Sequence, residues 1–106
     1  MDMEEHWVRQ LQAWAAANES VRELWLFGSR AKGTSHPKSD VDIALALTPP
    51  DIQHDMSLFK YMDLGDQWQH ELETIVGRHV SLEAIEPGSP YDAEVRNIGK
   101  LLWARK

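Results

Sequence analysis

Two apolar runs enclosing a polar, glycine-containing segment place the strongest constraint on how this chain can fold. The runs lie within Val21–Phe27, which is apolar on both faces in its second half, and within Val41–Leu47, and each of these segments has the length and composition of a buried β-strand. The segment between them contains Gly28, Gly33 and Pro37, which favour a turn, a short helix and a loop. The chain is therefore expected to build a sheet, and the remaining segments must cover it.

Helical periodicity supplies the covering elements. Three segments are predicted to be helical: residues 3–17, about 51–76 and about 89–98. Apolar side chains recur at helical spacing in the first two, and a glycine follows the second and the third. Two further short apolar segments predict strands: Val80–Ile85 and, at an edge of the sheet, Lys100–Ala104. We therefore predict one α/β (α+β) domain over residues 1–106, in which helices pack against a small mixed sheet.

Composition excludes several classes of protein. The longest apolar runs are five residues, far shorter than the ~20 of a membrane-spanning helix. The chain has no cysteine, so it can form neither a disulfide nor a thiolate metal site. Its first charged residues are acidic, unlike a signal peptide, and we expect a cytoplasmic location. The net charge of −6 argues against general nucleic-acid binding.

The segment between the first two strands carries the chemistry. Gly28 allows a phosphate to approach the backbone at the start of the short helix, and Ser29 adds a hydroxyl. Arg30 and Lys32 either neutralise further phosphate charge or are simply solvated. No acid occurs between Gly28 and Ser39, so this segment suits an anionic ligand.

Two aspartates follow that basic segment. Asp40 and Asp42 are two positions apart, so both side chains face one side of a strand, ~6.6–7 Å apart along the chain. Two carboxylates at this spacing can hold one or two hard cations such as Mg²⁺, which prefer oxygen ligands. The sequence therefore predicts that a phosphate-binding turn and a metal-binding pair meet in one cleft.

A Gly-Ser pair, ten residues and Asp-x-Asp together resemble the nucleotidyltransferase superfamily that includes DNA polymerase β. More closely, the chain resembles the minimal nucleotidyltransferases, which are encoded beside HEPN-domain partners in toxin–antitoxin pairs. The resemblance implies the polymerase β-type fold, with Gly28 and Ser29 at the triphosphate and Asp40 and Asp42 binding Mg²⁺ at the α-phosphate. It also implies an antitoxin that transfers AMP from ATP, or another nucleotide, to a tyrosine hydroxyl of the HEPN partner.

The chain departs from the family pattern at the third carboxylate. Ser81 stands where this acid is expected, and Glu83 lies two residues on, on the same face of the strand. Either Glu83 serves as the third catalytic carboxylate beside Asp40 and Asp42, or that position is empty. In the second case the protein is a non-catalytic, nucleotide-binding antitoxin that neutralises its partner by contact. An antibiotic-modifying transferase is a third interpretation, which the lack of room for a second, acceptor-binding domain disfavours.

Overall fold

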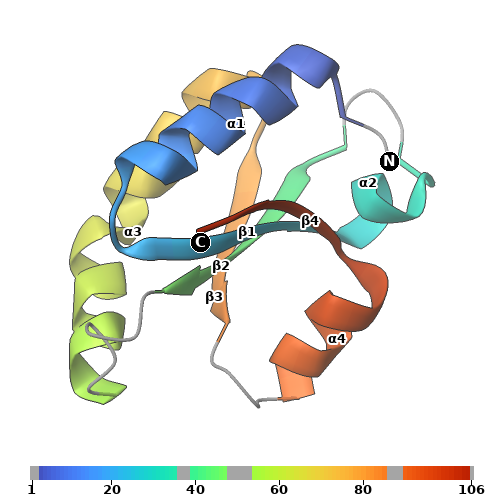
Figure 1. Ribbon diagram of the computed structural model, residues 1–106. Coiled ribbons are helices and arrows are strands. Elements are labelled where there is room, and N and C mark those ends of the chain that lie inside the picture. The colour runs from blue at the N-terminus through green and yellow to red at the C-terminus, as the bar shows by residue number, and fades with distance from the viewer. Residues whose placement is uncertain (1–2, 36–38, 48–53, 86–89, 106) are drawn as a thin grey trace.

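A computed structural model describes residues 3–35, 39–47, 54–85 and 90–105 of the chain. Figure 1 shows a sheet with helices against both of its faces. The helices are α1 (Glu5–Ala17), α2 (Gly28–Lys32), α3 (His54–Val76) and α4 (Pro90–Ile98). The strands are β1 (Val21–Phe27), β2 (Val41–Leu47), β3 (Val80–Ile85) and β4 (Lys100–Ala104).

These elements confirm the predicted order of helices and strands. The bounds of all four predicted strands are those of the structure, because each is a short apolar run between residues that favour turns. Gly33 and Gly77 end α2 and α3 in the left-handed conformation, with φ of 76° and 65°. The predicted start of the long helix, the loop residue Pro37 and Ser89 lie outside the described residues.

The sheet is mixed, with strand order β3-β2-β1-β4. Strand β1 runs antiparallel to both β2 and β4, whereas β2 and β3 are parallel and are joined through α3. The register pairs Asp42 with Phe27 on one side and with Ser81 on the other. The end of β1, the start of β2 and the start of β3 therefore meet at one place in the sheet.

Helices α1 and α3 cover one face of the sheet, and α4 lies against the other (Figure 1). Alternate residues of β2 belong to two separate cores. The larger core, beneath α1 and α3, contains Val41, Ile43, Leu45 and Leu47. The smaller core contains Ala44 and Ala46 with Trp25, Ile85 and Val95. Because side chains alternate along a strand, Asp42 belongs to the face that carries α4.

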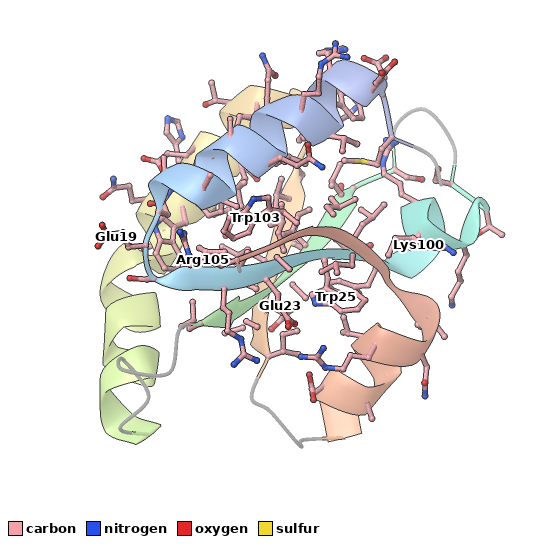
Figure 2. All side chains as sticks on the ribbon, in the orientation of Figure 1. Glu19, Glu23, Trp25, Lys100, Trp103 and Arg105 are labelled. Carbon is pink, nitrogen blue, oxygen red and sulfur yellow. The ribbon has the colours of Figure 1, made fainter. Side chains whose placement is uncertain are left out.

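A C-terminal arginine joins the last strand to the end of α1. Arg105 donates hydrogen bonds to the carbonyl oxygens of Ala15, Asn18 and Val21, at 3.2, 3.0 and 3.1 Å. Its guanidinium also lies over the ring of Trp103, 4.9 Å from the centroid, and Figure 2 shows the two side chains together. A cation at this position complements the C-terminal end of the helix dipole. Among the described helices, none is long and apolar enough to cross a membrane.

Candidate active site

Gly28 connects β1 to α2 and lies directly against Asp42. Its φ is +72°, a conformation that residues with a side chain rarely adopt. A Cβ atom added here would overlap a carboxylate oxygen of Asp42 and would lie 2.9 Å from its Cγ. Glycine is therefore required at this position for two reasons, the backbone conformation and the close approach of the aspartate.

Asp42 is the second residue of β2, and Asp40 lies just before that strand. The side chain of Asp40 is exposed, whereas that of Asp42 is half-buried. Burial raises the pKa of Asp42, and the negative charge of Asp40 raises it further. A hydrogen bond from Ser81 and the positive charge that His79 carries when protonated act in the opposite direction.

Two neighbouring carboxylates, one of them partly desolvated, form a donor set that fits a hard divalent cation. The positive charge of such a cation offsets the negative charges of Asp40 and Asp42, and oxygen is its preferred ligand atom. Among the described residues, no group of three or more histidine, aspartate or glutamate side chains is placed to hold a metal ion. The site in this part of the chain is thus a pair of acids.

The parallel register decides which residue of β3 stands beside this pair. Ser81 is paired with Asp42, and its hydroxyl hydrogen-bonds to the Asp42 carboxylate. Glu83 is paired with Ala44 and is exposed. It lies two residues further along the strand, a separation of ~6.6 Å. A serine therefore occupies the position nearest Asp42, and a role for Glu83 stays a prediction.

The two basic residues of α2 have different surroundings. The side chain of Arg30 is buried, with 5% of the residue exposed, so the simple solvated interpretation is wrong for it. Its Nε and Nη2 donate to the carbonyl oxygen of Ser39, at 3.2 and 2.8 Å, and its guanidinium lies 5.6 Å from the centre of a Trp7 ring. Arg30 thereby ties α2 to α1 and to the segment before β2. Lys32 is exposed.

One residue near the aspartates was not predicted as part of the site. His79 precedes β3, and its Nδ1 lies 2.9 Å from Oε2 of Glu73 in the last turn of α3. The five histidines of the sequence show no metal-ligand spacing, so no role is predicted for His79 from the sequence. The signal that it belongs to the site is its position two residues before Ser81, which becomes meaningful only with the register of β2 and β3.

Comparison with known families agrees with this geometry. A family model described as "Polymerase beta, Nucleotidyltransferase" matches residues 9–106. This match covers most of the chain, including Gly28, Ser29, Asp40 and Asp42. The chain therefore belongs to the polymerase beta nucleotidyltransferase family, and the predicted fold is confirmed.

Solved structures share the same fold. A toxin–antitoxin crystal structure with AMP-PNP is 23% identical, with a TM-score of 0.64, and the match covers 98% of this chain and 76% of that one. The toxin–antitoxin MntA-HpeT, solved as a variant with two Asp→Glu substitutions, is 21% identical, with a TM-score of 0.66 and coverage of 93% and 74%. No curated protein sequence matches the chain.

Proposed function

We propose that this protein is an Mg²⁺-dependent nucleotidyltransferase that transfers AMP from ATP to a tyrosine hydroxyl of a HEPN-type toxin encoded nearby, and that it acts as the antitoxin. The observation that carries this proposal is the contact between Gly28 and Asp42, with Asp40 beside it. This contact brings together the turn proposed to take the phosphate and the two acids proposed to bind the metal. Membership of the nucleotidyltransferase family supports the same chemistry.

Each residue of the site would have its own role in such a reaction. Asp40 and Asp42 would hold the Mg²⁺, which supplies polarisation of the phosphoryl oxygens and neutralises charge at the leaving group. Gly28 and Ser29 would contact the triphosphate at the turn after β1. Lys32 is exposed on α2 and is available to pair with phosphate oxygens. Arg30 supports this arrangement by holding α2 in place, and a direct contact with nucleotide stays a prediction.

The nature of the partner is supported by the solved relatives. Both are described as toxin–antitoxin structures, and one of them holds AMP-PNP, an analogue of ATP. The two aspartates replaced in the MntA-HpeT variant are two positions apart, the spacing of Asp40 and Asp42. By this analogy the partner is a toxin, and we propose that one of its side chains is the acceptor.

A second function is favoured by one observation. Ser81 occupies the place beside Asp42 where the family pattern has a third carboxylate, and a serine is a poor base and a weak Mg²⁺ ligand beside a carboxylate. The alternative is a non-catalytic antitoxin that binds nucleotide and neutralises its partner by contact. The two functions share the fold, the nucleotide site and the partner, and differ only in whether a covalent bond is formed.

The deciding experiment uses ATP labelled at the α-phosphate, Mg²⁺ and the neighbouring HEPN protein. We expect label to move to that protein with the wild-type chain and not with Asp42→Asn, which removes a ligand charge from the site. Asp66→Asn is the matched control, because Asp66 is an exposed acid of α3 away from β2. A wild-type chain that binds AMP-PNP and inhibits the toxin without transferring label would establish the non-catalytic alternative.

A further inference from the structure

A histidine–glutamate pair stands at the edge of the aspartate site. The Nδ1 atom of His79 lies 2.9 Å from Oε2 of Glu73, and the same oxygen accepts a hydrogen bond of 3.0 Å from the backbone N–H of Val80. Glu73 is thus fixed by the backbone that carries its partner. A carboxylate that accepts from Nδ1–H sets the tautomer of the ring and leaves Nε2 as a hydrogen-bond acceptor.

The sheet places this histidine level with the two aspartates. The backbone N–H of Val41 donates to the carbonyl oxygen of His79 at 2.9 Å, and the next pairs in register are Val41 with Val80 and Asp42 with Ser81. His79 therefore adjoins the start of β2.

The ring of His79 is open to a ligand. Its side chain is 59% exposed. It lies in a shallow, wide-open depression together with Glu73, Gly77 and Arg78, at the end of α3. A group carried by another molecule can therefore approach Nε2 from solvent on this side of the protein.

We propose that His79, held by Glu73, binds the incoming acceptor hydroxyl and takes its proton. This inference rests on the proposed nucleotidyl transfer. The hydroxyl oxygen forms a bond to the α-phosphorus, the bond from that phosphorus to the bridging oxygen breaks, and pyrophosphate leaves with the electron pair. The hydroxyl proton passes to Nε2, and Glu73 stabilises the imidazolium through Nδ1–H.

This role separates His79, which precedes β3, from Glu83, a residue of β3 with suitable chemistry. Glu83 is paired with Ala44, whereas Ser81 is paired with Asp42. Glu83 therefore lies two residues further along β3, away from the end of the strand that adjoins the aspartates. It is exposed, and no described contact fixes its carboxylate. His79 is held in position by a partner, whereas Glu83 would have to reach back by ~6.6 Å. In this proposal His79, two residues before Ser81, takes the role of the carboxylate that the chain lacks at position 81.

The test measures the initial rate of label transfer from α-labelled ATP to the HEPN protein with the full chain. His79→Asn retains an amide nitrogen near the place of Nδ1, so it keeps the contact with Glu73 but removes Nε2. We expect this variant to slow transfer by roughly 10² or more. Its affinity for AMP-PNP with Mg²⁺ should equal that of the wild type, which also shows that it is folded. His70→Gln, an exposed histidine of α3, is the matched control and should transfer at the wild-type rate.

Two further variants complete the test. Imidazole added to His79→Gly should restore part of the lost rate, whereas a purely structural role would give no such rescue. Glu83→Gln tests the competing assignment, in which the glutamate rather than the histidine takes the proton. Full activity of His79→Asn, or a large loss in Glu83→Gln with no loss in His79→Asn, would overturn the inference and leave the proposed function standing. A wild-type chain that transfers no label would overturn both, and the two failures are thereby distinguished.

Discussion

Replacing Gly28 by alanine tests the central contact of the site. The change adds one methyl group at a residue whose φ is +72° and whose missing Cβ would overlap the Asp42 carboxylate. Two costs follow. A side chain in the left-handed conformation costs about 1–2 kcal/mol. Relieving the overlap by moving neighbouring atoms costs about 1–3 kcal/mol more.

Gly33→Ala is the control for the first of these costs. Gly33 has nearly the same backbone conformation, with φ of +76°, but an added Cβ there has no atom within 4 Å. Both substitutions reduce the freedom of the unfolded chain to the same degree, so this effect cancels between them. We expect the free energy of unfolding to fall by about 1–2 kcal/mol for Gly33→Ala and by about 2–5 kcal/mol for Gly28→Ala.

Urea unfolding followed by tryptophan fluorescence measures these differences, and titration with Mn²⁺ measures the metal site. The overlap also pushes the Asp42 carboxylate out of place, so Gly28→Ala should weaken Mn²⁺ binding by about 10-fold or more, whereas Gly33→Ala should leave it unchanged. Adding Asp42→Ala should remove most of the extra cost of Gly28→Ala, because the overlapping atoms are then absent. Equal stabilities and equal Mn²⁺ affinities of the two glycine variants would refute the reasoning.

Three further outcomes are expected. The pKa of Asp42 is raised on folding, so ionisation of this carboxyl destabilises the fold as pH increases through that pKa. Asp42→Asn should therefore unfold at a higher urea concentration than wild type at pH 7. This difference should disappear as pH falls below about 3.8, where the carboxyl is protonated in both states. Ser81→Asp places a third acid beside Asp42, and calorimetric titration should show tighter Mn²⁺ binding than in wild type, with a less stable apo protein. Arg30→Met removes the charged hydrogen bonds to Ser39 and the contact with Trp7, and urea unfolding should show a loss of about 2–3 kcal/mol; an unchanged midpoint would mean that the buried guanidinium contributes nothing.

Local sequence determined the helices and strands of this fold and, within the site, the positions of Gly28, Asp40 and Asp42. The apolar runs Val21–Phe27 and Val41–Leu47 became β1 and β2 with the predicted bounds, because strand formation there follows from short-range pattern and flanking turn residues. Gly28 was also predictable as a special position, since a strand, a glycine and a helix follow one another directly in the chain. Asp40 and Asp42 lie near each other because they are two residues apart.

Tertiary structure decided which residues at the start of β3 lie beside the two aspartates. Strand β3 is joined to β2 through the long helix α3, and its register depends on how that helix and both cores pack, so no local pattern reveals which residue faces Asp42. Packing likewise buried Arg30, which sequence alone would leave in solvent or on a phosphate. The contact of His79 with Glu73 joins the start of β3 to the end of α3. Such contacts form between surfaces that only the complete fold brings together, and for that reason the pair of acids was readable from the sequence and the histidine beside them was not.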